Sequence, residues 1–196
     1  MKKIKLGLPK GSLNTVGRGN THQLFVDAGY DIKGYTPGKE SDKQLRVVND
    51  PDVIPFLTRP QSAPVELNKQ LLDIAIVGED WIREETIGIA GSKLERIGDL
   101  EYGKTRLVIA IQKDTTYTSL SDILKAKNKA GKPILCFTEY PNVMRQRFLE
   151  DKLYQELYGN EKPLIQVRGI VDGTNNMVQI INSDGVTEGY MAKGAD

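Results

Sequence analysis

The residues best suited to chemistry in this sequence lie in short loops that follow predicted strands. The first such loop contains Lys10, Gly11 and Ser12. A glycine lets the backbone approach a ligand, exposed N–H groups can hold phosphate oxygens, and Lys10 adds a compact positive charge. The full nucleotide P-loop pattern is absent, because its distant glycine and its Lys-Ser/Thr order are missing. The loop is therefore either an anion site or an ordinary tight turn.

A second loop carries two carboxylates directly after an apolar run. Residues 74–77 are typical of a parallel strand covered on both faces, and they lead into Gly78, Glu79 and Asp80. The carboxylates could bond ribose hydroxyls or contact a bound Mg²⁺. From the pattern alone, it is at least as plausible that they stabilise the first turn of the next helix through its dipole.

Three further places offer contacts to an anion or a nucleotide. Arg59 follows an apolar stretch, and an arginine at a strand end can make paired bonds to a phosphate, although a solvated surface arginine is the common alternative. Tyr140 lies between a predicted strand and a predicted helix, and Thr187 and Glu188 lie in the segment 184–189. Loops near a helix start suit anions, and helix capping is the alternative.

The composition excludes several classes of protein. In 196 residues, 39% are hydrophobic and 27% are charged, which is typical of a globular domain. The net charge of +1 predicts no nucleic-acid partner. No apolar run approaches the ~20 residues of a membrane helix and no signal peptide is evident, so a cytoplasmic protein is expected. The sequence has one histidine, His22, and one cysteine, Cys136, which argues against a His-based metal cluster and against a catalytic Cys-His pair. Cys136 is interpreted as a buried structural thiol.

Predicted strands and helices alternate along the chain. Strands are predicted at residues 4–8, 53–57, 74–77, 106–111, 134–138 and 164–167. Helices are predicted at residues 21–28, 63–72, from 81 onward, 119–129, 142–158 and 174–181. The alternation predicts an α/β fold with mainly parallel sheets, in which Pro55 argues against a central place for its strand. Ligands of such folds gather beyond the carboxyl ends of strands, here the loops after Leu8, Val77 and Thr138.

Taken in order, these segments resemble the ATP phosphoribosyltransferase family. The resemblance rests on residues 4–13, 27–30, 54–61, 72–82, 103–110, 138–143, 187–188 and 194–196. The strongest match is the run Leu-Asp-Ile-Ala-Ile-Val-Gly-Glu-Asp-Trp-Ile at 72–82. Pro60 and Ser62 stand where the family usually has an alanine and an acidic residue. The family's threonine- and glycine-rich phosphate loop is expected just after Asp196, so the resemblance predicts a chain cut before that loop.

The resemblance implies a fold and a reaction. The fold has two lobes like the type II periplasmic binding proteins, with a cleft between them. Lobe I comprises residues 1–103 plus 188–196, and lobe II comprises residues 104–187. The reaction transfers a phosphoribosyl group from phosphoribosyl pyrophosphate to N1 of ATP, with pyrophosphate leaving, and opens histidine biosynthesis.

The resemblance also implies roles for individual residues, and no covalent nucleophile is among them. Lys10 and Arg59 are expected to contact anions, and Gly11 and Ser12 to donate backbone hydrogen bonds. The other expected substrate contacts are Gly78, Glu79 and Asp80 around ribose or metal, Tyr140 in the nucleotide pocket, and Thr187 and Glu188 in the cleft wall. Mg²⁺ is expected on the pyrophosphate, and the partners are expected to be further copies of the chain and possibly a separate regulatory subunit.

Two other interpretations stay open from the sequence. A non-enzymatic ligand-binding protein can share the two-lobed fold, because fold does not fix function. A homologue that binds nucleotides without turnover is the second, because the phosphate loop is missing from the sequence.

Overall fold

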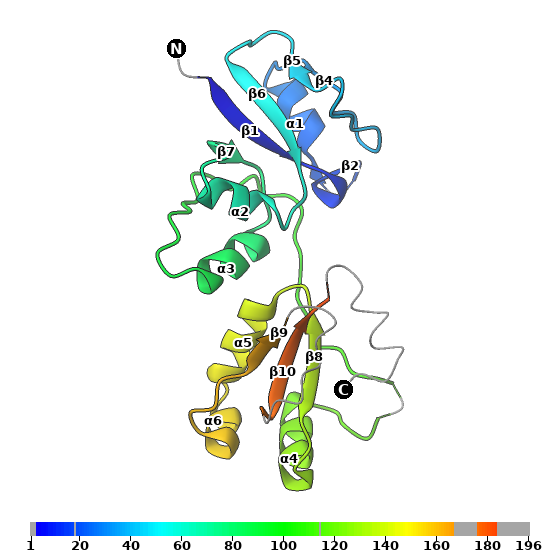
Figure 1. Ribbon diagram of the computed structural model, residues 1–196. Helices are drawn as coiled ribbons and strands as arrows, with labels where there is room; N and C mark the ends of the chain where they lie inside the picture. Colours follow the sequence, from blue (N-terminus) through cyan, green and yellow to red (C-terminus); the bar gives the residue numbers. More distant parts are fainter. Residues whose placement is uncertain (1–2, 18, 114, 167–175, 184–196) are drawn as a thin grey trace. The chain divides into compact units, whose positions relative to one another are not determined.

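Two three-stranded parallel sheets form the frame of the chain (Figure 1). The computed structural model describes residues 3–17, 19–113, 115–166 and 176–183. The chain divides into Met1–Arg106, called unit 1, and Leu107–Asp196, called unit 2. Each unit holds one of the sheets, which confirms the predicted α/β class with mainly parallel sheets. The predicted lobe boundaries stay a prediction, and their segment 188–196 lies outside the described residues.

The sheet of unit 1 has the first strand of the chain in the middle. The strands are β6 (Val53–Thr58), β1 (Ile4–Pro9) and β7 (Ile74–Ala75), in the order β6-β1-β7. Pro55 lies opposite Leu6 in an edge strand, as predicted, because an edge strand tolerates a residue without an N–H. A Cβ added at Gly7 would lie 2.7 Å from Leu72 Cδ1 and 2.8 Å from Ala75 Cβ, so glycine allows this close packing of β1 on its neighbours.

Short helices and two antiparallel pairs complete unit 1. The helices are η1, a 3-10 helix (Gly11–Leu13), α1 (Thr21–Asp27), α2 (Ala63–Asn68) and α3 (Glu79–Gly88). The pairs are β2 (Asn14–Thr15) with β3 (Gly19–Asn20), and β4 (Ile32–Lys33) with β5 (Arg46–Val47). The core of the unit consists of Leu6, Leu8, Ile32, Tyr35 and Val47.

Unit 2 repeats the parallel arrangement with different elements. Its strands are β8 (Ile134–Thr138), β10 (Val178–Asn182) and β9 (Leu164–Gln166), in the order β8-β10-β9. Its helices are α4 (Leu120–Ala130), α5 (Pro141–Leu149) and α6 (Lys152–Tyr158). Ser119 caps α4 by accepting a hydrogen bond from the N–H of Asp122. Cys136 is half-buried and packs against the core of this unit.

The prediction of a helix at residues 174–181 is wrong from residue 178 onward, where the structure has β10; residues 174–175 lie outside the described part. Val178, Gln179, Ile180 and Ile181 are all buried, because β10 is the central strand of its sheet. A strand buried on both faces lacks the alternation of apolar and polar residues. Its periodicity therefore cannot be told from that of a buried helix.

The helix predicted at residues 142–158 is two helices. Glu150 ends α5, and the carboxylate of Asp151 accepts hydrogen bonds from the N–H groups of Leu153 and Tyr154 at the start of α6. The predicted apolar stripe still packs on the core, with Phe148 fully buried and Met144, Leu149, Leu153 and Leu157 packed against it. An N-cap inside a continuous apolar stripe is therefore the signal that the prediction missed.

The strand predicted at residues 106–111 is absent. No strand pairs with this segment among the described residues, and the side chains of Leu107, Val108 and Ile109 are 46%, 69% and 50% exposed. A strand needs a partner for its backbone groups, which an apolar sequence alone does not supply. Two other elements are shorter than predicted: α2 ends at Asn68, and β7 is a half-buried edge strand rather than one covered on both faces.

Candidate functional site

Three predicted site loops follow the carboxyl ends of the three strands of unit 1. Because the strands are parallel, these loops leave the sheet on the same side, which is called the sheet edge below (Figure 1). Pro9 lies opposite Thr58, and the N–H of Lys10 donates to the carbonyl of Thr58 at 3.0 Å, so Lys10 and Arg59 follow adjacent strands. On the other side of β1, the N–H of Ile76 donates to the carbonyl of Gly7 at 3.1 Å. The chain then runs through Gly78 into α3. The structure thus brings Lys10, Gly11, Ser12, Arg59, Gly78, Glu79 and Asp80 to one end of the sheet.

The loop after β1 keeps its backbone donors available. Gly11 has φ +81°, a conformation that strains other residues, and nothing lies within 4 Å of an added Cβ. Among the described residues, the N–H groups of Gly11 and Ser12 have no hydrogen-bond acceptor. The carbonyl of Gly11, in contrast, accepts from the Thr15 hydroxyl at 2.9 Å and from the N–H of Asn14. Free donors beside occupied acceptors suit the binding of an anion.

Lys10 is held by a single exposed carboxylate. Its Nζ lies 3.2 Å from Oδ2 of Asp42, and the two side chains are 42% and 69% exposed. Ion pairs of this kind contribute only ~0–1 kcal/mol. An incoming anion can therefore take the place of Asp42 at little cost.

Arg59 presents its guanidinium at the end of β6. The residue is exposed, and its guanidinium makes no hydrogen bond or ion pair within the described part of the chain. Its backbone is well fixed, because its carbonyl accepts from the N–H groups of Ser62 and Ala63 at 2.9 and 3.1 Å. Arg59 thus has a backbone fixed by hydrogen bonds and a charged group that is available to a ligand.

Both interpretations of Glu79 and Asp80 fit the geometry. Gly78 is the N-cap residue of α3, and the two carboxylates lie in the first turn, where they complement the helix dipole. They also lie at the sheet edge that carries Lys10 and Arg59. Glu79 is 81% exposed and pairs with Arg96 at 3.8 Å, a contact that a ligand can displace.

The carboxylates are suited to Mg²⁺ only together with a substrate. Among the described residues, no group of three or more His, Cys, Asp and Glu side chains is arranged to hold a metal ion. Mg²⁺ commonly uses one or two carboxylates together with substrate phosphates and water, rather than a cage of protein atoms. Glu79 and Asp80 provide such oxygens, so the residues present fit an ion that arrives with a phosphorylated substrate.

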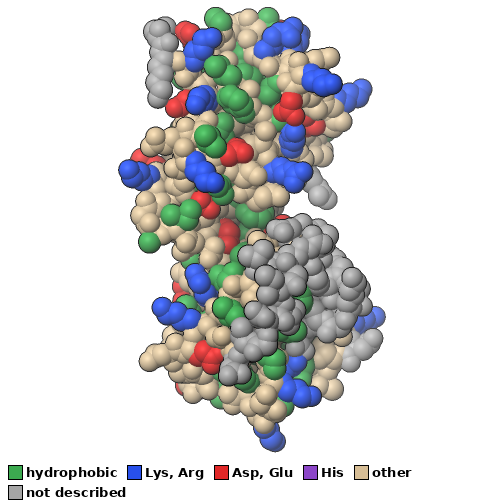
Figure 2. Space-filling view, viewed as in Figure 1, with side chains coloured by type: hydrophobic (Ala, Val, Ile, Leu, Met, Phe, Trp, Pro, Cys, Tyr) green, Lys and Arg blue, Asp and Glu red, His purple; other side chains and the backbone are tan. Residues whose placement is uncertain are grey.

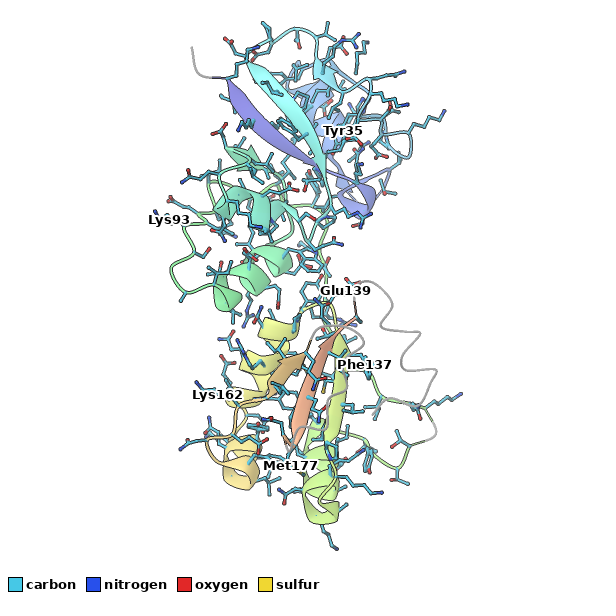
Figure 3. The ribbon with its side chains drawn as sticks, in the orientation of Figure 1. Tyr35, Lys93, Phe137, Glu139, Lys162 and Met177 are labelled. Atoms are coloured by element: carbon cyan, nitrogen blue, oxygen red, sulfur yellow. The ribbon has the colours of Figure 1, made fainter. Side chains whose placement is uncertain are left out.

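The remaining predicted site residues belong to unit 2. Tyr140 is the N-cap residue of α5, and its N–H donates to the hydroxyl of Thr138 at the end of β8 at 3.0 Å. Figure 3 shows Glu139 beside it, where the chain leaves that strand. Thr187 and Glu188 lie outside the described residues, and their role stays a prediction.

A buried polar network behind the first loop was missed by the sequence analysis. The side chain of Asn14 donates to Glu40 at 2.7 Å and accepts from the N–H of His22 at 2.9 Å. Tyr35, which lies in the core of unit 1 (Figure 3), donates to the carbonyl of Pro9 at 2.8 Å. These contacts could not be predicted from the spacing of residues, because they join residues far apart in the sequence.

Burial raises the pKa of the Tyr35 and Tyr102 hydroxyls, and hydrogen bonding with Thr21 opposes the rise at both. The two groups therefore stay protonated at neutral pH and can act as hydrogen-bond donors.

The described residues form no large patch of one charge on the face seen in Figure 2. On the face seen in Figure 2, lysine and arginine side chains of the described residues are intermixed with acidic ones. None of the described helices is both long and apolar enough to cross a membrane.

This chain is similar to a known protein family and to several of its members. The model of the ATP phosphoribosyltransferase (HisG) family matches residues 59–196. An ATP phosphoribosyltransferase of Desulforudis audaxviator is 32% identical over 186 residues, which cover 90% of this chain and 56% of the relative. One of Methanosarcina barkeri is 31% identical over 172 residues, which cover 85% of this chain and 52% of the relative. The chain thus spans about half the length of these curated relatives, and it belongs to the ATP phosphoribosyltransferase family.

Proposed function

We propose that this chain binds phosphoribosyl pyrophosphate and ATP and transfers the phosphoribosyl group to N1 of ATP, the first step of histidine biosynthesis. Family membership supports the reaction. The observation that carries the proposal is the gathering of Lys10, Arg59 and the unpaired N–H groups of Gly11 and Ser12 at one sheet edge. A phosphorylated substrate needs such a set of positive and hydrogen-bonding groups.

The reaction breaks the bond between the anomeric carbon of the sugar and the pyrophosphate oxygen. The electron pair of that bond leaves with the pyrophosphate, and a lone pair of N1 of ATP forms the new bond to the same carbon. No protein nucleophile is required. The chain has to align the two substrates and stabilise the charge on the leaving group.

In this proposal, the residues at the sheet edge divide that work. Lys10 and Arg59 bind the phosphate oxygens, and the N–H groups of Gly11 and Ser12 add neutral donors that need no reorganisation. Gly78, Glu79 and Asp80 lie near the ribose hydroxyls and the metal. Mg²⁺, when bound, would neutralise part of the charge on the pyrophosphate.

Further parts of the proposal concern the whole protein. We expect two lobes like those of the type II periplasmic binding proteins, with lobe I formed by residues 1–103 and 188–196 and lobe II by residues 104–187. Tyr140 would contribute to the nucleotide pocket, and Thr187 and Glu188 to a cleft wall. A cytoplasmic homo-oligomer, possibly with a separate regulatory subunit, belongs to the same proposal.

A direct assay tests the function. The purified chain is incubated with ATP, phosphoribosyl pyrophosphate and Mg²⁺, and the ultraviolet absorbance of the adduct is followed, with a reaction lacking phosphoribosyl pyrophosphate as the control. Accumulation of the adduct in the complete reaction alone is the expected result. Calorimetric binding of ATP without any adduct would instead favour a nucleotide-binding protein that does not turn over.

A variant pair connects the assay to the proposed site. Arg59→Ala removes a charge at the sheet edge, whereas Lys162→Ala removes an exposed charge in unit 2 (Figure 3). We expect the first variant to lose adduct formation and the second to keep it. Equal activity in both variants would contradict the placement of the site.

A further inference from the structure

The segment that leads from unit 1 toward unit 2 returns to the loop at the end of β1. The hydroxyl of Tyr102 lies 2.8 Å from the hydroxyl of Thr21, across 81 positions of sequence. Thr21 is fully buried and donates to the carbonyl of Leu13 at 2.6 Å. Tyr102 is therefore linked through one side chain to the backbone of the loop that holds Gly11 and Ser12.

The direction of these hydrogen bonds follows from the number of protons. A threonine hydroxyl has one proton, and Thr21 gives it to the carbonyl of Leu13. The hydroxyl of Tyr102 must then be the donor to Thr21. The result is a directed chain from Tyr102 through Thr21 to Leu13, and successive hydrogen bonds of this kind strengthen one another.

The same segment also packs on the loop. Gly103 has φ +70°, and a Cβ added to it would lie 2.5 Å from Cδ2 of Leu13. The backbone conformation favours glycine at this position, and its backbone passes close to the side chain of Leu13. Both a hydrogen bond and a van der Waals contact connect residues 102–103 with the end of the loop.

Fixing the loop carbonyls also fixes its donors. A trans peptide group is planar, so its carbonyl and its N–H point in opposite directions. The carbonyl of Gly11 is directed to Thr15 and Asn14, which turns the N–H of Ser12 away from them. The carbonyls of Pro9 and Leu13, at the two ends of the loop, are held by buried hydroxyls. The peptide of the Leu13 carbonyl carries the N–H of Asn14, which donates to the carbonyl of Gly11. The hold of Thr21 on Leu13 is thus passed on to the peptide that carries the N–H of Ser12, next to Gly11.

We propose that Tyr102 is a positioning residue for the anion site, acting through Thr21 on the backbone of residues 10–13. The inference rests on the proposed function, because the anion in question is the diphosphate of phosphoribosyl pyrophosphate. Tyr102 does not touch the ligand in this account. Its hydroxyl keeps the Gly11 and Ser12 donors in the orientation that binds phosphate, which lowers the entropic cost of binding.

The test compares two tyrosines that lose the same atom. Tyr102→Phe removes the hydroxyl above Thr21, and Tyr154→Phe removes a hydroxyl that donates to the carbonyl of Glu161 at 2.9 Å in unit 2. We expect Tyr102→Phe to weaken calorimetric binding of phosphoribosyl pyrophosphate about three- to tenfold, since one hydrogen bond is lost. Tyr154→Phe is expected to leave that affinity unchanged, although it too loses a hydrogen bond that supports the fold.

Variants of the middle residue test the proposed route. Thr21→Val removes the linking hydroxyl and is expected to weaken binding as Tyr102→Phe does, whereas Thr21→Ser keeps the hydroxyl and the affinity. Because both changes break one chain of hydrogen bonds, the double variant of Tyr102→Phe and Thr21→Val is expected to bind no more weakly than either single variant. Additive losses would show that Tyr102 acts by another route and would overturn the inference.

A ligand-free measurement separates this inference from the proposed function. Nitrogen-15 relaxation of the free chain is expected to show lower order parameters for the Gly11 and Ser12 amides in Tyr102→Phe, with those of unit 2 unchanged. Unchanged order at both amides would overturn the positioning role. Failure of the unsubstituted chain to bind phosphoribosyl pyrophosphate would contradict the proposed function instead, while a loss of order at Gly11 and Ser12 would still support the positioning role.

Discussion

Units 1 and 2 use tyrosine hydroxyls in different ways on similar parallel sheets. In unit 2, Tyr154 donates to the carbonyl of Glu161 in the loop after α6, and Tyr158 donates to the carbonyl of Leu124 in α4. The two rings stack at 5.0 Å between centroids. In unit 1, Tyr35 donates to Pro9 at the entrance of the candidate anion loop. A hydrogen bond from a tyrosine hydroxyl to a backbone carbonyl thus supports packing in unit 2 and the geometry of the candidate site in unit 1.

The described carboxyl ends of the two sheets carry different polar groups. Both units contain three parallel strands with loops at their carboxyl ends. In unit 1 these loops carry Lys10, Arg59 and two backbone donors. In unit 2, β8 ends at Thr138, whose hydroxyl accepts from the N–H of Tyr140 at the start of α5. The two sheets have the same number of parallel strands, but different polar groups fix the described loops at their carboxyl ends.

The largest expected effect comes from the core of unit 2. Phe148→Ala removes a fully buried ring that lies 5.5 Å from the ring of Tyr154, and it is expected to cost about 3–5 kcal/mol of the free energy of unfolding. Urea unfolding followed by circular dichroism measures the loss. The fluorescence of Trp81, the single tryptophan, reports on unit 1. An equal shift of both transitions would contradict the separate cores.

The next effect sharpens the assignment of charge to unit 1. Lys10→Ala and Arg59→Ala are each expected to weaken binding of phosphoribosyl pyrophosphate by about 1.5–3 kcal/mol, because a charge-assisted hydrogen bond is lost. Isothermal titration calorimetry measures the change, and Lys162→Ala in unit 2 is the control. Unchanged affinity in both variants would show that Lys10 and Arg59 do not bind this substrate.

Much of this contrast follows from the sequence. The alternation of strands and helices predicted parallel sheets, and parallel strands place Lys10, Arg59 and Asp80 at one edge without further information. The central position of β10 could not be predicted, because its run of buried residues has no polar alternation. The contact between Thr21 and Tyr102 also could not be predicted, since it joins two hydroxyl groups that only the tertiary fold brings together.

A pH titration tests the structural role of the unit 2 tyrosines. Burial, together with the charges of Glu161 and Tyr158, raises the pKa of Tyr154 to about 12. Because the folded pKa lies above the unfolded value, this stabilisation is complete below about pH 10 and is lost as the pH rises toward 12. At pH 11 the loss is expected to be about 1 kcal/mol in urea unfolding. Tyr154→Phe is expected to show a smaller decrease between pH 8 and pH 11, and an equal decrease would contradict this origin.

The smallest effect concerns the ion pair at the site. Asp42→Asn removes the carboxylate that competes with a ligand for Lys10, so the affinity for phosphoribosyl pyrophosphate is expected to rise, by up to about fivefold. Asp31→Asn is a matched control, because Asp31 pairs with Lys33 at the same 3.2 Å distance. A decrease in affinity for Asp42→Asn alone would mean that Asp42 orients Lys10 rather than competing for it.

The most direct test of the central claim is a titration of the nitrogen-15-labelled chain with phosphoribosyl pyrophosphate and Mg²⁺, followed by the amide resonances of both units. The account predicts that the Gly11 and Ser12 amides shift in a saturable manner, since their N–H groups lack acceptors and are the proposed phosphate donors. Saturable binding that leaves the amides of Gly11 and Ser12 unshifted would contradict it.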